Sequence, residues 1–272
     1  MSRSVRRAPL SRLLLVAIGL FYLLPMLSMA RFAFQRVPMY LLDRDTLLTK
    51  WTFMPLVDAV RRPEFATAAL LSVRLAAIAA VLTLVLLLPT LVYAHVSLPA
   101  ARPVLDTIAV LPFVVPAIAL VVGISGAFRP IAPWFISSDL SLVPFYVVIA
   151  LPYTYRSIDN ALSALDLRTL VDASRSLGAG WPRIVWQVVI PNVRGGLATA
   201  ALLVATVVLG EFTVASLLLK ETLPLYLSYS QGSDPQGTFA IGLALMIITA
   251  GLLGVINRAS ARRGGATVTG VM

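Results

Sequence analysis

The residues whose types and spacing suggest a specific role lie in one polar stretch of the chain. There, Asp172 is followed by the small residues Ala173 and Ser174, then by Gly178, and further along by Pro191. A single carboxylate with no second reactive group beside it is poorly suited to acid–base or nucleophilic catalysis. It can meet basic or amide groups of another protein, and small neighbours let the two backbones approach closely. These residues therefore offer no catalytic pair, and their types would allow close contact with another protein.

Several kinds of chemistry are excluded by residues that the sequence lacks. The chain has no cysteine and one histidine, which excludes disulfides, thiolate catalysis and clustered histidine metal sites. No glycine-rich phosphate-binding loop is present, since neither of the two lysines, Lys50 and Lys220, follows a glycine. No Ser/His/Asp set or pair of carboxylates appears in the apolar runs. We expect no cofactor, no metal and no enzymatic activity.

A second group of candidates interrupts the apolar parts of the chain. Glu211 and Phe212 fall within an apolar run, and a carboxylate inside a membrane is costly enough to suggest a function. It could contact a cationic solute on a transport path, or it could be a structural group hydrogen-bonded to neighbouring helices. Pro112 and Pro116 interrupt another run and predict kinks, which could serve gating or packing. The lone His95 is expected to be a solvated residue at the inner membrane interface.

Composition shows which elements must position these residues. Hydrophobic residues make up 59% and charged residues 12% of the chain, and the mean hydropathy is +0.90. An average soluble domain has about 25% charged residues. The sequence therefore predicts an all-α integral membrane protein. The net charge of +10 crowds into loops and tails, where topology and anionic lipid headgroups explain it better than nucleic acid does.

Six apolar runs are long enough to be transmembrane helices of about 20 residues. They cover residues 10–30, 66–93, 104–128, 142–160, 195–219 and 239–257. Together they form one transmembrane domain over residues 1–272. If the N-terminus is inside, thirteen Lys and Arg residues lie in inside segments and eight in outside segments. Because basic residues favour the cytoplasmic side, we predict that both termini and the polar segment 161–194 are cytoplasmic.

The polar segment is predicted to form two short helices. Apolar residues of the first, over about 165–177, recur at helical spacing: Leu167, Leu170, Val171 and Leu177. Charged residues occupy its other face as possible ion pairs: Arg168, Asp172 and Arg175. Gly178 can end this helix in a left-handed conformation. Pro182 suits the first turn of a second helix, which we expect to end at Pro191.

The polar segment resembles the EAA loop of ABC importer permeases. That motif reads Glu-Ala-Ala, three residues, Gly, nine residues, Ile, any residue, Leu-Pro. Asp172-Ala173-Ser174 through Gly178 and Val188-Val189-Ile190-Pro191 match its spacing, with substitutions that keep charge or bulk. The loop also precedes the penultimate predicted span, as it does in that family, and the resemblance extends over most of the chain from Trp51 onward.

The resemblance implies a type I (MetI-like) permease bundle of six transmembrane helices in a prokaryotic inner membrane. The loop would then be a coupling helix that docks on ABC ATPase subunits through Asp172, Ala173, Ser174, Gly178 and Pro191. Hydrolysis of ATP would take place in those subunits. Further implied partners are a second, homologous but non-identical permease subunit, an extracytoplasmic substrate-binding protein and the lipid bilayer.

The transported solute is less well defined by these patterns. Leu111-Pro112 and Gly210-Glu211-Phe212 look most like the spermidine/putrescine group, which implies a polyamine. Related groups carry ferric iron, thiamine, phosphonates or sulfate, and these stay open as alternatives. A secondary transporter or channel subunit is a rival from another class, but it needs intramembrane ion-binding groups and commonly an internal repeat.

Overall fold

The structure is a computed structural model that describes residues 8–35 and 49–264. Both chain ends and the middle of the first predicted outside loop lie outside the described residues. The described residues form helices, and their only strand-like feature is an isolated bridge between Gln35 and Trp51. They group into two compact units: the first takes residues 8–35, 49–66 and 227–247, and the second takes 67–226 and 248–264.

Four helical stretches in the described ranges are long and apolar enough to cross a membrane: Arg12–Phe34, Pro63–Val96, Trp181–Gly210 and Pro235–Leu252. The first and last belong to α1 (Ala8–Phe34) and α13 (Pro235–Gly264), and the second is α3. A fifth candidate is a bent pair of helices. The predicted fourth run is α7 (Leu142–Ser163), whose 22 residues extend for about 33 Å. Its second half is polar, so six spans stay a prediction.

The predicted third run is broken rather than kinked. It forms α4 (Arg102–Val114) and α5 (Ala117–Phe128), bent by 100° relative to each other. Val115 between them is extended, with φ −85° and ψ 117°, because a residue before proline disfavours the helical region. Pro116 then starts α5, whereas Pro112 stays inside α4. The interruption expected at Pro116 is therefore present as a break and not as a kink, and a single span over 104–128 stays a prediction.

The predicted end of the second loop helix at Pro191 was also wrong. Helix α9 (Trp181–Ile184) continues through a π-helical turn, Val185–Val189, into α10 (Ile190–Gly210). A proline lacks an N–H and its ring crowds the preceding turn, and a π-turn is one way to accommodate this. The Asn192 Nδ2 donates to the carbonyl of Val188 at 2.7 Å. Pro191 thus lies in the first turn of α10.

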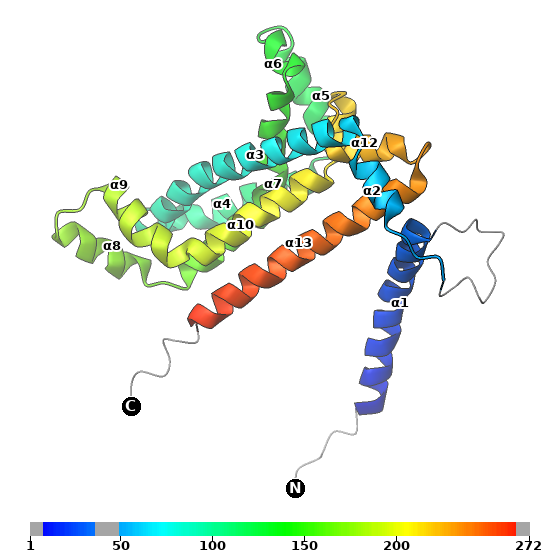
Figure 1. Ribbon diagram of the computed structural model, residues 1–272. Helices are drawn as coiled ribbons and strands as arrows, with labels where there is room; N and C mark the ends of the chain where they lie inside the picture. The colour runs from blue at the N-terminus through cyan, green and yellow to red at the C-terminus, as the bar shows by residue number, and fades with distance from the viewer. Residues whose placement is uncertain (1–7, 36–48, 265–272) are drawn as a thin grey trace. The chain divides into compact units, whose positions relative to one another are not determined.

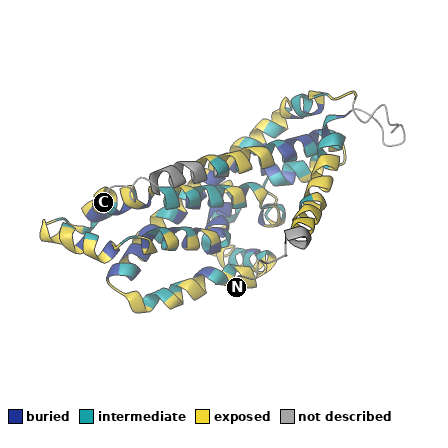
Figure 2. Cartoon of the chain, turned by 90° about the horizontal axis from the view of Figure 1, so that it is seen from below, coloured by how far each residue is buried: buried dark blue, intermediate teal, exposed yellow. Residues whose placement is uncertain are grey.

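The second unit is organised around α7 and α10, which pack against each other, and α3, which shares a buried core with both and runs beside α10 in Figure 1. Gly196 on α10 lies so close to α7 that a Cβ there would be 2.4 Å from the Cβ of Ala161. Ser157 on α7 donates to the Gly196 carbonyl at 3.0 Å. Buried residues lie where helices of the unit face one another, and exposed residues cover their outer sides (Figure 2).

Short elements complete the second unit. They are η3 (Pro99–Ala101), α6 (Pro133–Ser137), η4 (Asp139–Ser141), α8 (Leu167–Ser176), α11 (Thr213–Leu217) and the first half of α12 (Leu223–Ser230). The Leu223 N–H donates to the buried Ser72 hydroxyl of α3 at 2.7 Å. This bond ties the start of α12 to α3.

The first unit joins the end of α1, the short α2 (Met54–Val60) and the first half of α13. An ion pair of 2.9 Å joins Arg62 to Asp234, and the other Asp234 oxygen accepts from the Gly237 N–H at 2.9 Å, capping α13. A Cβ at Gly237 would lie 2.7 Å from the Cβ of Ala59. Glycine is therefore needed there for α13 to approach α2.

Candidate functional site

The first predicted loop helix is present as α8, Leu167–Ser176. Its N-terminus is capped by Asp166, whose side chain accepts from the Thr169 N–H at 3.4 Å. Sequence reasoning missed this cap, although an Asp three residues before Thr169 is an ordinary N-cap signal. The cap fixes the point at which the chain leaves α7 and enters α8.

Gly178 ends α8 in a left-handed conformation, with φ +80°. The Gly178 N–H donates to the Arg175 carbonyl at 2.8 Å and the Ala179 N–H donates to the Ser174 carbonyl at 3.0 Å. These two bonds are those of a Schellman motif. A Cβ at Gly178 would meet no atom within 4 Å, so the fold requires glycine here for its backbone and not for space.

The two faces of α8 differ in burial. Leu167 and Val171 are buried in the apolar core formed with α3, α4, α7 and α10. The residues on the other side and at the C-terminal end are exposed, and we call this set the α8 edge: Asp172, Ala173, Ser176, Leu177 and Gly178. Leu177 is 88% exposed, so grouping it with the apolar residues Leu167 and Val171 on one face of the helix was wrong. The helix ends at Ser176, and Leu177 leaves the helical periodicity.

The other predicted docking residues are less available. Ser174 is half-buried, and its hydroxyl donates to the Leu170 carbonyl at 2.7 Å. Pro191 is exposed, but it lies on α10 and not on α8. The structure therefore places Asp172, Ala173 and Gly178 together on the α8 edge and adds Leu177, which the sequence reasoning had grouped with the apolar face of the helix.

The charged side chains of α8 do not pair as expected. In the described part of the chain, Asp172 has no basic side chain within ion-pair distance. Arg175 instead lies over the ring of Trp181, with its guanidinium carbon 4.7 Å from the ring centroid. This cation–π contact ties the end of α8 to α9. The Asp172 carboxylate is left at the surface.

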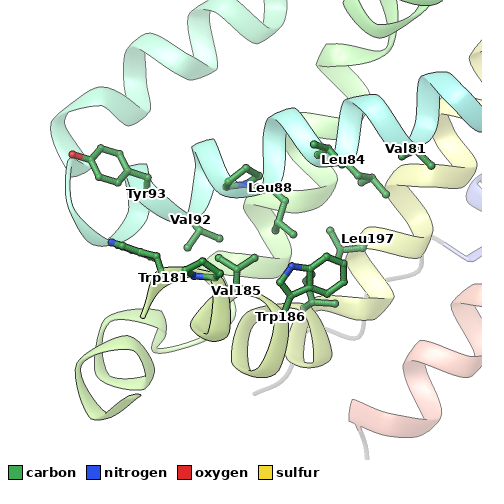
Figure 3. A pocket seen from close by; sticks show the side chains of 13 residues that line it. Val81, Leu84, Leu88, Val92, Tyr93, Trp181, Val185, Trp186 and Leu197 are labelled. Carbon is green, nitrogen blue, oxygen red and sulfur yellow. The ribbon is translucent and has the colours of Figure 1, made fainter. Parts of the chain in front are cut away.

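An apolar groove lies beside this loop, between α3 and the segment from α9 to α10 (Figure 3). Its volume is about 780 Å³, and Trp181 and Trp186 face Leu88 and Val92 across it. The lining contains no carboxylate, amine, guanidinium or imidazole group. An ionic solute would find no charged partner in this groove.

The candidates for a solute path lie at two helix breaks. Glu211 and Phe212 separate α10 from α11, and Phe212 is exposed. Both Glu211 carboxylate oxygens lie 3.0 Å from the Val214 N–H, which donates to them, and Oε2 also accepts from the Ala215 N–H at 3.4 Å. The carboxylate therefore caps α11. The predicted run 195–219 is accordingly broken at these residues.

The second break is the one between α4 and α5, which involves Pro112 and Pro116. Helix α5 packs against α11, and Val121 and Val214 belong to the same buried cluster. The structure thus brings the elements that follow the two breaks into contact. Among residues 8–35 and 49–264, no three potential ligand side chains are grouped so that they could hold a metal ion.

A polar cluster that sequence reasoning missed lies at the α8 end of the second unit. The Nε2 of His95 is 2.7 Å from Asp159 Oδ1, and Arg102 Nη2 is 3.3 Å from the same oxygen. Arg102 Nη2 also donates to Ser163 Oγ at 3.2 Å. We call these four residues the Asp159 cluster. The His95 side chain is only 9% exposed, so the expectation of a solvated histidine was wrong.

Comparison with known proteins gives the chain a family. The model of the binding-protein-dependent transport system inner membrane component matches residues 99–263. The chain is 30% identical over 207 residues to the molybdenum transport system permease protein ModB of Mycobacterium tuberculosis, covering 70% of this chain and 78% of that protein. The same values hold for ModB of Mycobacterium bovis. It is 28% identical over 256 residues to the sulfate transport system permease protein CysW of Synechocystis, covering 86% of each.

A solved structure shares the fold. It is a bacterial ABC transporter involved in the import of the acidic polysaccharide alginate, with a TM-score of 0.64 and 18% identity, covering 95% of this chain and 99% of that chain. The sequence matches and the apolar helices agree with the loop motif in pointing to one class of membrane protein. The chain belongs to the family of binding-protein-dependent transport system inner membrane components, the multi-pass permease subunits of ABC importers.

Proposed function

We propose that this chain forms half of the translocation path of an ATP-driven importer, and that α8 is its coupling helix. The observation that carries the proposal is the α8 edge. An apolar side chain, Leu177, stands 88% exposed beside an unpaired carboxylate and small residues, on a helix whose other face is buried. Such an arrangement fits a partner that covers Leu177 and donates to Asp172.

The mechanical requirement is that a push on α8 reaches the membrane helices. Leu167 and Val171 anchor α8 in the apolar core, and the Arg175–Trp181 contact joins it to α9. From Trp181 the helix continues to Gly210 through the π-turn. Movement of the ATPase would therefore be passed on as a rigid-body tilt.

The two helix breaks support a solute path near α5 and α11. Transporters commonly bind their solutes where helices are interrupted, because the freed backbone groups can then contact the ligand. We place the path along Phe212 and the break that holds Pro112 and Pro116. Glu211 caps α11 and so holds the start of this helix in place beside the path. Its carboxylate accepts hydrogen bonds from backbone N–H groups and therefore does not require a cationic solute as its partner.

For the solute, a tetrahedral oxyanion is favoured over the polyamine indicated by sequence patterns. Relatives named for molybdenum and sulfate transport support this class, and the capped Glu211 removes the main residue-level argument for a cation. A polyamine stays the alternative. Calorimetric titration of the cognate binding protein with sulfate, molybdate and spermidine separates the two classes.

The partners follow from the family: ABC ATPase subunits, a substrate-binding protein and a second permease subunit, which we expect to be homologous but not identical. We expect both termini and α8 to lie on the cytoplasmic side, with six helices crossing the bilayer. The rival, a secondary transporter or channel subunit, would work without an ATPase.

Copurification tests the proposal directly. A Leu177→Asp variant should lose affinity for the ATPase, because burying an unpaired charge replaces an apolar contact; loss of a central interface residue costs about 2 kcal/mol or more, roughly 30-fold in affinity. The matched control is Leu98→Asp, which changes another exposed leucine in the second unit. Wild-type protein that binds no ATPase, or equal retention by the two variants, would count against α8 as the coupling helix.

A further inference from the structure

The Asp159 cluster joins the ends of three helices through a single carboxylate. Asp159 lies on α7, His95 in the last turn of α3, and Arg102 is the first residue of α4. Besides the bonds given above, Arg102 Nη2 lies 3.4 Å from Asp159 Oδ2. The Tyr155 hydroxyl of α7 donates to the Arg102 carbonyl at 3.4 Å. The backbone and side chain of Arg102 are thus both held by α7.

The side chains of the cluster are partly buried. Side-chain exposure is 9% for His95, 19% for Asp159 and 39% for Arg102. Arg102 Nε is buried with no hydrogen-bond partner among the described residues, so its guanidinium depends on Asp159 and Ser163. Without the Asp159 charge, an imidazole and a guanidinium would remain close together with no anion between them.

Part of the Asp159 cluster lies close in sequence to α8, the proposed coupling helix. Helix α7 ends at Ser163, a cluster member, and α8 begins at Leu167. Val96 of α3 and Leu162 of α7, the sequence neighbours of His95 and Ser163, share one apolar core with Ala109 of α4 and Val171 of α8. The polar contacts therefore close the same end of the unit at which α8 is anchored.

Apolar packing alone does not explain how movement of α8 would be passed on to α3 and α4. It is non-directional, so helices that share only such a core can slide or rotate when one of them is pushed. Charge-assisted hydrogen bonds have a fixed direction. Partly exposed ion pairs add little to stability. A positional role is therefore the better explanation of the Arg102–Asp159 pair and the His95 hydrogen bond at this junction.

We propose that Asp159 is a positioning residue for transport: through His95 and Arg102 it makes the ends of α3 and α4 move with α7 and α8 when the ATPase binds ATP. The inference rests on the proposed coupling role of α8. The chain of contacts runs from α8 through its short link to α7, across the Asp159 carboxylate to Arg102, and from there along α4 to the break at Pro116 beside the proposed solute path.

Distance measurement between spin labels tests this without knowledge of the solute. The chain has no cysteine, so Thr107→Cys on α4 and Thr169→Cys on α8, both exposed sites outside the α8 edge, can be labelled selectively. The assembled importer is measured without nucleotide and with ATP trapped by vanadate. In the parent, the distance between the labels should be the same in both states, because the two helices move together.

The Asp159→Asn variant should show an ATP-dependent shift of the mean distance that the parent lacks. Asp159→Glu, which keeps the charge, should reduce that shift. Arg102→Gln should reproduce it and serves as a second variant if Asp159→Asn fails to assemble. The matched control is Asp106→Asn, which removes an exposed carboxylate of α4 outside the cluster and should behave as the parent.

The outcomes separate the two proposals. An ATP-dependent shift already present in the parent, or its absence from both Asp159→Asn and Arg102→Gln, overturns the role of the cluster and leaves the coupling role of α8 standing. A chain that forms no complex with an ATPase overturns the coupling role, and the role of Asp159 falls with it.

Discussion

At the scale of single residues, backbone conformation decides what Gly178 and Glu211 can do. Gly178 has φ +80° and open space around its missing side chain. Glu211 is extended, and its carboxylate caps the next helix. In both cases the residue shapes a helix end. Its effect on a partner or a solute is therefore expected to pass through the helix that it ends or begins.

The conformational role of Gly178 predicts a graded series of substitutions. A side chain in the left-handed region costs about 1–2 kcal/mol for most residues, whereas Asn tolerates it. Gly178→Asn should therefore keep most of the copurified ATPase, and Gly178→Val should lose it. Equal loss in both variants would mean that the partner itself needs the empty space at this position.

The capping role of Glu211 predicts different effects of two substitutions. Gln can still accept a backbone hydrogen bond, whereas Ala cannot, and loss of a cap costs about 0.5–2 kcal/mol. Glu211→Gln should give nearly normal complex yield and nearly normal uptake of the solute identified by the binding protein. Glu211→Ala should lower the melting temperature and yield. Normal yield with abolished uptake in Glu211→Gln would restore the carboxylate to a solute-contacting role.

At the scale of helices, close approach matters more than hydrophobicity. The crossing of α7 and α10 depends on Gly196, where an added Cβ would lie 2.4 Å from the Cβ of Ala161. Gly196→Ala should destabilise the protein by about 1–3 kcal/mol, the usual cost of overpacking. Adding Ala161→Gly should restore much of the melting temperature. Gly123→Ala is the control, since a Cβ there meets nothing within 4 Å.

Local sequence signals predicted much of this architecture. The apolar runs located the long helices, and the spacing of Leu167 and Val171 located α8 to within two residues. Gly178 was correctly expected to be left-handed. The errors in helix boundaries concern prolines, because a proline can begin a helix, break one or lie within one, and tertiary packing decides which. Pro191, Pro112 and Pro116 show all three outcomes.

Contacts between distant residues could not be predicted in this way. His95 and Asp159 are separated by 64 positions, and Arg62 and Asp234 by 172. In neither pair does the sequence around one residue indicate which distant residue it contacts. The same holds for the donors to Glu211, because the break at residue 211 depends on how α11 packs against α5 and α7. The parts of the candidate site that depend on neighbouring residues, such as α8 and Gly178, could therefore be predicted. The Asp159 cluster, which depends on contacts between distant residues, was missed.

At the scale of the whole molecule, the proposed topology depends on α7. This helix joins the loop that contains Ser137 to the loop that contains α8. Its 22 residues extend for about 33 Å, enough to cross a hydrocarbon core of about 30 Å. Its polar second half nevertheless leaves it outside the set of helices that hydropathy alone would select. Whether α7 crosses the bilayer decides whether α8 can reach a cytoplasmic ATPase.

Labelling single cysteines on either side of α7 tests this. Ser176→Cys on α8 should be protected from a membrane-impermeant maleimide in intact cells and labelled in inverted vesicles. Ser137→Cys, which is also exposed, should show the reverse pattern and serves as the matched control. The native chain contributes no background because it has no cysteine. Labelling of both positions from the same side would mean that α7 does not span the membrane. Labelling of Ser176→Cys from outside alone would place α8 on the side without ATP, where it could not couple transport to hydrolysis.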